Sequence, residues 1–304
     1  MRSIVNTIQS ALILVLFNNM AFSQDKNWPQ WRGLNYDGVA NNNQNPPVKF
    51  SKKDNVIWSS KIPGRGHGSP TLYDGYIFIA TADETIKTQS LICLNEKTGE
   101  IIWNRQVHNG GFPEKSNKKA SQASSTPATD GKLVYINFLN NGAVYTTAYD
   151  YEGKKVWQKK ICNYILHQGF STSPVIYKSL LIVSADNKAG GAICALNKDD
   201  GQIVWKINRP KKPNYTSPVI YKLKGRDELI FQGCDLVTSL DPLTGKKLWE
   251  TTGSTTECVS SIVTDGEHVF TSGGSPKNHV AAIKAEDLVK LFGKILVEYT
   301  FHQC

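Results

Sequence analysis

Residues 217–252, with the sequence SPVIYKLKGRDELIFQGCDLVTSLDPLTGKKLWETT, contain one complete unit of a repeat. The unit opens with Ser217-Pro218 and holds runs of strand-forming residues at 219–221, 229–231 and 236–240; after the turn at Thr244-Gly245, a fourth segment follows at 246–249. This pattern predicts four short strands in a unit of about forty residues. Four strands per unit favour a blade of a β-propeller over other repeat architectures.

Two sequence marks recur together in four copies. A glycine stands four residues before a tryptophan in the pairs Gly99/Trp103, Gly153/Trp157, Gly201/Trp205 and Gly245/Trp249. Upstream of these pairs lie Ser69-Pro70, Thr126-Pro127, Ser173-Pro174 and Ser217-Pro218. We expect each glycine to occupy a turn that needs φ > 0. Each tryptophan is expected to pack across the neighbouring blade and dock the two blades together.

The end of each copy carries a further pattern. It approximates Ala-x-Asp-x-x-Thr-Gly-x-x-x-Trp at 93–103, 148–157, 195–205 and 239–249, with the second copy one residue short. Over about residues 27–284 the chain therefore resembles the PQQ-repeat, or quinoprotein-like, β-propeller family. The segment Asn27-Trp28-Pro29-Gln30-Trp31-Arg32-Gly33 is similar to the opening motif of an exported bacterial group in that family. The resemblance implies an all-β propeller of four-stranded blades.

The first 23 residues have the features of a signal peptide. Arg2 gives a positive start, residues 11–17 are apolar, and Ala21-Phe22-Ser23 resembles a signal-peptidase site. The apolar run is too short to span a bilayer. We therefore expect cleavage before Gln24, a periplasmic or secreted location, and no membrane-spanning segment. Residues 24–54 are expected to form an irregular arm, and residues 55–304 the propeller.

Four regular blades are expected at about 67–107, 122–161, 170–208 and 215–252, and a fifth copy begins at Cys258. Residues 55–60 are predicted to form a lone strand of the final type, centred on Trp58. The fifth copy degenerates over 284–304, where Val297 stands in the place of a tryptophan. This end looks truncated or frameshifted, so the ring could be incomplete. The Trp58 strand then pairs with residues 284–300 or leaves an open edge that promotes self-association.

Strand order places the longer and chemically unusual loops on one face of the propeller. Loops on a rigid scaffold often carry function, and a channel mouth is a natural pocket. The ligand-binding candidates on this loop face are His67, His167, Gln168, Asp186, Asn187, Asp235 and Glu257. Equally, these side chains could only bond loop backbone. A metal site from His67, His167, Asp186 and Glu257 is a weaker hypothesis, because no local ligand spacing supports it.

Cysteine content and charge leave two further questions. Cys234 and Cys258 are expected on loops of adjacent blades, either as a disulfide or as two free thiols. The net charge of +9 suggests an acidic partner, but the basic residues are spread over turns. Together with the predicted export, this spread argues against nucleic acid as the partner.

Two function classes remain open. One is a non-catalytic exported propeller that binds an envelope protein or a polysaccharide through its loop face, without a cofactor. The other, implied by the resemblance, is a quinoprotein dehydrogenase that oxidises an alcohol or sugar with PQQ and calcium. The chain has no adjacent cysteine pair of the kind such enzymes often carry. Binding is therefore favoured, because function depends on the site and not on the fold.

Overall fold

The computed structural model describes residues 26–40, 45–114 and 117–284. The predicted signal peptide lies outside this part of the chain, as do residues 285–304 of the degenerate end. Within the described ranges, no helix is long and apolar enough to cross a membrane.

Five antiparallel sheets make up the described fold, four with four strands and one with three. The first holds β1 (Thr71–Tyr73), β2 (Tyr76–Asp83), β3 (Thr88–Asn95) and β4 (Ile101–Asn109). The second holds β5 (Ala128–Thr129), β6 (Leu133–Asn140), β7 (Ala143–Asp150) and β8 (Lys155–Asn163). The third holds β9 (Val175–Tyr177), β10 (Leu180–Ser184), β11 (Ala192–Asn197) and β12 (Ile203–Asn208). The fourth holds β13 (Val219–Leu223), β14 (Arg226–Gly233), β15 (Leu236–Leu240) and β16 (Lys247–Thr252). The fifth holds β17 (Val263–Thr264), β18 (His268–Gly273) and β19 (His279–Lys284).

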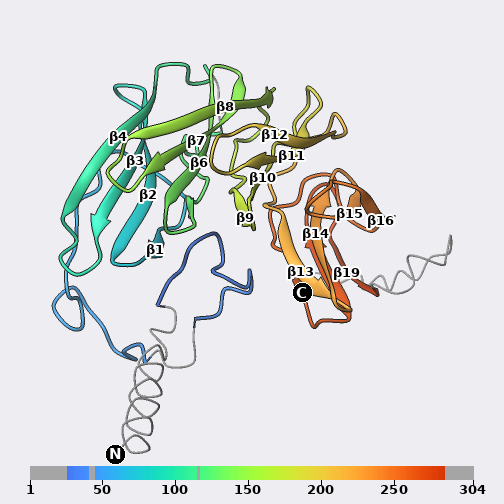
Figure 1. The fold of residues 1–304 in the computed structure, drawn as a ribbon, viewed down its shortest axis with the longest axis horizontal. Helices are drawn as coiled ribbons and strands as arrows, with labels where there is room; N and C mark the ends of the chain where they lie inside the picture. Colours follow the sequence, from blue (N-terminus) through green and yellow to red (C-terminus); the bar gives the residue numbers. More distant parts are fainter. Residues whose placement is uncertain (1–25, 41–44, 115–116, 285–304) are drawn as a thin grey trace, which may run out of the picture.

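Each sheet is a simple meander in which strands pair in sequence order. The sheets follow one another along an arc, with the first and fifth sheets near its two ends (Figure 1). The predicted all-β fold of four-stranded propeller blades is confirmed. The three predicted strands of the degenerate fifth copy are present, at nearly their expected positions.

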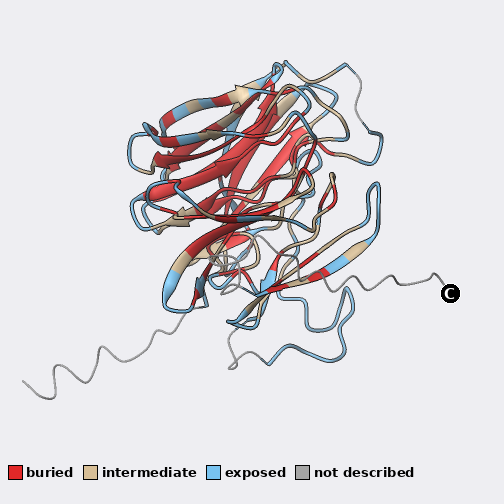
Figure 2. Ribbon diagram, turned by 90° about the vertical axis from the view of Figure 1, so that its right-hand side faces the viewer, coloured by how far each residue is buried: buried red, intermediate tan, exposed pale blue. Residues whose placement is uncertain are grey.

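The cores lie between the sheets and not within any one of them. Side chains alternate along each strand, so one set faces the preceding blade and the other faces the following blade. Phe78 and Leu91 of the first sheet, for example, pack against Val134 and Ile136 of the second. Figure 2 shows the buried residues concentrated in the stacked sheets and the exposed residues in loops and outer strands. Stability therefore depends on contacts between neighbouring blades.

The four repeat tryptophans lie in these interfaces. Trp103, Trp157, Trp205 and Trp249 are 5%, 9%, 9% and 4% exposed. The Nε1 groups of Trp103, Trp157 and Trp205 donate to the carbonyls of Tyr151, Lys198 and Pro242, at 2.8, 3.0 and 3.1 Å. Each acceptor belongs to the glycine turn of the next blade. Trp249 differs: it donates to Glu228 Oε2 at 2.7 Å, within its own sheet.

The predicted strand at 55–60 is wrong, because the structure has no strand there. No strand of the described residues pairs with this segment, so its backbone lacks the ladder that defines a strand. Trp58 nevertheless occupies the blade-docking position on the first sheet, where its Nε1 donates to the Glu96 carbonyl at 2.8 Å. The adjacent Ile57 is 92% exposed. The tryptophan is correctly placed, but a sheet around it is missing from the described part of the chain.

The N-terminal arm crosses the first strands of four successive sheets. Its contacts pair Trp28 with Leu72, Pro29 with Thr129, Gln30 with Ile176, and Tyr36 with Tyr221. Trp28 and Leu72 exchange two backbone hydrogen bonds, at 2.7 and 3.0 Å. First strands line the inside of a propeller, so the arm lies across the inner edge of the arc, as the blue trace in Figure 1 shows. It connects blades that are far apart in sequence.

The Ser/Thr-Pro dipeptides form a second connection along the inner strands. The backbone N–H of Ser69 donates to the Thr126 hydroxyl at 2.9 Å. Thr126 donates in the same way to Ser173 at 3.0 Å, and Ser173 to Ser217 at 2.9 Å. The repeated hydroxyl therefore accepts a bond from the preceding blade, while the proline begins the strand without a donor.

Candidate functional site

A pocket of about 390 Å³ opens on the loop face of the arc. Loops of the second to fifth blades line it, including Asn117, Gln168, Phe170, Tyr215, Glu257 and Val259. Because four blades contribute, the pocket is a product of the arc and not of any single repeat. Its place agrees with the face on which the candidate residues were expected.

Glu257, which lines the pocket, belongs to a polar cluster with His167 and Lys188, which lie outside the lining. His167 Nε2 lies 3.2 Å from Glu257 Oε1, and Lys188 Nζ lies 2.9 Å from His167 Nδ1. The lysine can only donate, so a neutral imidazole accepts at Nδ1 and carries its proton at Nε2. The histidine thus links a cation on one loop to a carboxylate on another.

Tyr215 completes the environment of the carboxylate. Its hydroxyl donates to Glu257 Oε2 at 3.4 Å. Burial raises the pKa of Tyr215, and the negative charge of Glu257 raises it further, so the hydroxyl keeps its proton. The two oxygens of Glu257 thus lie against different partners: Oε2 accepts from Tyr215, and Oε1 lies 3.2 Å from His167 Nε2.

The remaining pocket lining is amide and apolar. Asn117 Nδ2 donates to Gln168 Oε1 at 2.6 Å, which joins two interblade loops across the rim. Phe170 and Ala120 form apolar wall, and Val259 is 77% exposed. The lining therefore combines hydrogen-bonding groups with apolar wall, a combination that is common in binding pockets.

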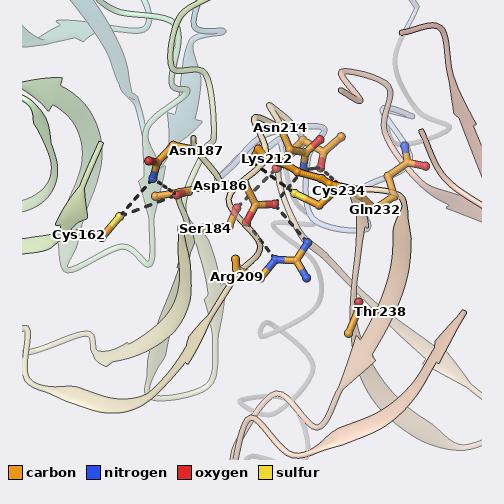
Figure 3. A network of polar contacts seen from close by, with 12 residues as sticks. Cys162, Ser184, Asp186, Asn187, Arg209, Lys212, Asn214, Gln232, Cys234 and Thr238 are labelled. Carbon is orange, nitrogen blue, oxygen red and sulfur yellow. Dashed lines mark hydrogen bonds and ion pairs between the residues drawn. The ribbon is translucent and has the colours of Figure 1, made fainter. Parts of the chain in front are cut away.

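Asp186 does not belong to the pocket, although it was a binding candidate. It is buried at the end of β10 and forms a two-point ion pair with Arg209, at 2.9 and 3.3 Å (Figure 3). Asn214 also donates to it, at 3.2 Å. Burial acts to lower the pKa of Arg209, but Asp186 outweighs this effect and holds that pKa above its usual value. The Arg209 guanidinium stacks 4.5 Å from the Phe231 ring, so the pair ties the third blade to the fourth.

Asn187 is fully buried and serves the backbone. Its Nδ2 donates to the carbonyls of Asn163 and Ala185, at 3.2 and 3.0 Å, and its Oδ1 accepts from Ile165 at 3.2 Å. Asn140 has the equivalent role one blade earlier, where it donates to Gly110 at 2.7 Å. For Asn187, the side chain therefore holds loop backbone and does not face a ligand.

Asp235 and His67 lie apart from the pocket lining. Asp235 pairs with Lys212 at the surface and accepts from Thr256 at 2.6 Å. The His67 side chain is exposed, and its backbone N–H donates to Ala123 at 2.9 Å. Of the seven candidates, the structure therefore brings together His167, Gln168 and Glu257.

The structure shows whether Cys234 and Cys258 form a disulfide and whether the proposed metal ligands meet. Cys234 and Cys258 are both buried free thiols, so the disulfide is not formed. Their sulfurs have different partners: Cys234 donates to Lys212 O at 3.5 Å, and Cys258 lies 3.2 Å from Ser254 Oγ. The metal cluster is not assembled, because no three His, Cys, Asp or Glu side chains in the described ranges are grouped to hold an ion.

Tyr215, Asn117 and Phe170 were not predicted as site residues. Each lies on an interblade loop, and Tyr215 stands directly before the Thr216-Ser217-Pro218 mark of the fourth blade. That position beside the inner strands could have indicated a channel-facing side chain. The contact between Tyr215 and Glu257 could not be predicted from the sequence, because the two residues are 42 positions apart in the chain.

The pocket residues do not fit PQQ with calcium. PQQ is a polycarboxylated quinone, so its site needs cationic side chains, and the described lining has no lysine or arginine. Calcium needs several oxygen ligands with negative charge. The described lining has one carboxylate, Glu257, and its Oε2 already accepts a hydrogen bond from Tyr215.

Comparison with known proteins places the chain in a family. The sequence model described as outer membrane protein assembly factor BamB matches residues 48–164 and 89–291, which together cover most of the chain. BamB from Moraxella catarrhalis superimposes with a TM-score of 0.57 at 14% identity, covering 82% of this chain and 68% of that one. Quinohemoprotein alcohol dehydrogenase from Comamonas testosteroni superimposes with a TM-score of 0.51 at 14% identity, covering 72% and 41%.

This chain thus spans less than half of the dehydrogenase. No curated protein matches the sequence. The structural likenesses, at such low identity, show the fold alone. The family match extends over the repeats themselves, and the chain belongs to the BamB-like PQQ-repeat β-propeller family.

Proposed function

We propose that this protein is a non-catalytic scaffold of the bacterial cell envelope that binds a protein partner through its loop face. The observation that carries the proposal is the pocket built from the loops of four blades around Glu257 and Tyr215. The description of its family as an outer membrane protein assembly factor supports a role in assembly. The predicted signal peptide and that family description both favour the periplasm.

A protein partner suits the chemistry of the pocket better than a polysaccharide. The exposed Val259 offers apolar area that an aliphatic or aromatic side chain would cover, and the largely buried Phe170 forms part of the wall beside it. Such buried anchors dominate protein interfaces. Glu257 adds a carboxylate that a lysine or arginine of the partner could approach from the open side. The amide pair Asn117–Gln168 offers hydrogen bonds at the rim.

Site-directed photo-crosslinking in cells tests the proposal. A photoreactive amino acid at Val259 should form an adduct with a protein, and the same probe at Val156 should not. Val156 is the matched control because it is also an exposed valine, but on the outer strand β8. Glu257→Lys combined with the Val259 probe should weaken the adduct without lowering the melting temperature.

The outcomes distinguish a protein partner from a polysaccharide and one face from the other. An adduct that resists protease but is cleaved by glycosidases would favour a polysaccharide over a protein. The turns between first and second strands lie on the opposite face, and Lys132, between β5 and β6, is a probe there. Adducts at Lys132 with none at Val259 would contradict the loop-face assignment. Changing His167 and Glu257 together should also weaken binding. Asp186 is left intact in this test, because it is buried and its replacement would also affect folding.

A further inference from the structure

The first sheet has an apolar groove on the side that faces away from the second sheet. The groove has a volume of about 520 Å³ and is lined by Trp58, Ile62, Leu72, Ile77, Ile79 and Leu94, among others. It lies on a different surface from the loop-face pocket and shares no lining residue with it. Its apolar lining resembles the faces that are buried between neighbouring blades of this fold.

The register of the strands shows what kind of surface this is. Ile77 pairs with Leu94 in the first sheet, just as Val134 pairs with Tyr149 in the second. Val134 is fully buried, because the first sheet covers it. Ile77 is only partly buried, since no sheet among the described residues covers the equivalent face of the first blade. The groove is therefore an interblade face without its neighbouring blade.

One segment of the chain already lies where a strand of that neighbouring blade would lie. Trp58 donates to Glu96 O as Trp103 donates to Tyr151 O one blade later. The Ser60 hydroxyl donates to Gly99 O, which corresponds to the bond from Arg105 to Gly153 O in the next interface. Residues 58–62 thus follow the path of a fourth, outermost strand. The groove lies where the three inner strands of the same blade would pack.

The fifth sheet contains the strands that the Trp58 segment lacks. It contains a first, second and third strand, and β19 is its edge within the described part of the chain. Along β19, Ala281 and Ile283 are buried toward the fourth sheet, whereas Val280 is 42% exposed on the other side. Over residues 263–284, then, the sheet has no fourth strand beside β19. The Trp58 segment follows the path of a fourth strand but has no sheet beside it. The segment and the fifth sheet lie near opposite ends of the arc (Figure 1).

We propose that two copies of this chain associate head to tail through these surfaces. The fifth sheet of one copy covers the groove of the next, and its β19 edge pairs with the Trp58 segment. The contact continues the series of interblade interfaces. Within each copy, Trp58 already packs on Gly99 as the other repeat tryptophans pack on their glycines. Free strand edges and uncovered apolar faces both favour such pairing. The contact is heterologous, so a second copy leaves one groove and one edge free and the assembly can grow.

Complementation between two blocked variants tests the proposal with the full chain. Ile79→Glu places a charge in the groove, and Val280→Glu places one on the exposed side of β19. Val156→Glu, on an outer strand away from both surfaces, is the matched control. Molar mass is measured by sedimentation velocity from low micromolar to submillimolar concentration, with melting temperatures to confirm folding.

Wild type and Val156→Glu should show concentration-dependent dimers and longer species. Each blocked variant alone should be monomeric, because every head-to-tail contact needs one groove and one β19 edge. Their equimolar mixture should form a dimer and nothing larger, since each chain retains one intact surface. Should Ile79→Glu prove unstable, Ile62→Glu in the Trp58 segment blocks the same groove.

Three results would overturn the proposal. A wild-type monomer at all concentrations would mean that another part of the same chain covers the groove, or that nothing does. Dimers of Val280→Glu but not of Ile79→Glu would indicate a groove-to-groove contact. Monomers in the equimolar mixture would exclude head-to-tail pairing.

Discussion

Trp157 interlocks with Gly201 across the boundary between the second and third sheets. A Cβ atom at Gly201 would lie 2.6 Å from Cε3 of the Trp157 indole, closer than any normal contact. The same relation joins Trp103 to Gly153. The glycine and tryptophan that stand four residues apart in the sequence therefore each contact a different neighbour: the glycine meets the preceding blade, and the tryptophan meets the following one.

Gly201→Ala should destabilise the protein by more than about 2 kcal/mol, because it combines a left-handed backbone with a steric clash. The φ of Gly201 is +73°. Gly225→Ala is the control: its φ is +83°, but no described atom lies within 4 Å of its Cβ position. It should cost only the backbone term of about 1 kcal/mol. Urea unfolding measures both, and equal losses would show that the indole contact contributes nothing.

Trp205→Ala should lower the free energy of unfolding by roughly 3–5 kcal/mol, as expected for loss of a buried tryptophan. It removes the Trp205 side chain from the core shared by the third and fourth sheets, together with its bond to Pro242 O. Val204→Ala, on the same strand but 54% exposed, should cost less than about 1 kcal/mol. Comparable losses for the two variants in denaturant melts would contradict the blade-docking role.

The strands could be predicted because their signals are local. The repeat at 217–252 shows its turns and apolar runs directly in sequence, and β15 (Leu236–Leu240) begins and ends at the predicted residues. The lone strand around Trp58 could not be judged in this way. A strand exists only if another strand lies beside it, and that depends on parts of the chain far away.

The candidate site was harder to predict for the same reason. Asp186 and Asp235 both follow a second strand and look alike in the sequence. Asp186 is buried because Arg209 folds back to it, whereas the partner of Asp235, Lys212, stays at the surface. Similarly, Glu257 belongs to the pocket because Tyr215 and His167 reach it from other blades. Such partners are set by how blades stack, which the pattern of one repeat does not reveal.

The two aspartates give a matched pair of predictions. Asp186→Ala should cost roughly 3–5 kcal/mol, because it leaves the buried Arg209 without a counter-ion. Asp235→Ala breaks an exposed pair and should cost less than about 1 kcal/mol. The side chains of the first pair are 5% and 4% exposed, and those of the second 47% and 43%. Thermal melts of both variants measure the difference, and a small loss for Asp186→Ala would mean that the network is dispensable.

Stability should decrease as the pH falls from about 6.5 toward 4, with His108 as one cause. Burial lowers the pKa of His108 from 6.5 to about 4, and the charge of Lys155 contributes to the same shift. Between these values the unfolded chain binds a proton that the folded protein does not, so acid favours unfolding, at up to about 1.4 kcal/mol per pH unit. Burial lowers the pKa of His279 as well, which acts in the same direction.

His108→Gln should therefore show a smaller fall in melting temperature between pH 7 and pH 5 than wild type does, because glutamine does not titrate. The His108 Nε2 atom is buried without a hydrogen-bond partner among the described residues, so the imidazole is held as a neutral ring against Phe138 and Tyr145. If His108→Gln and wild type lose the same melting temperature over this range, proton uptake at His108 does not contribute, and the acid sensitivity arises from other groups.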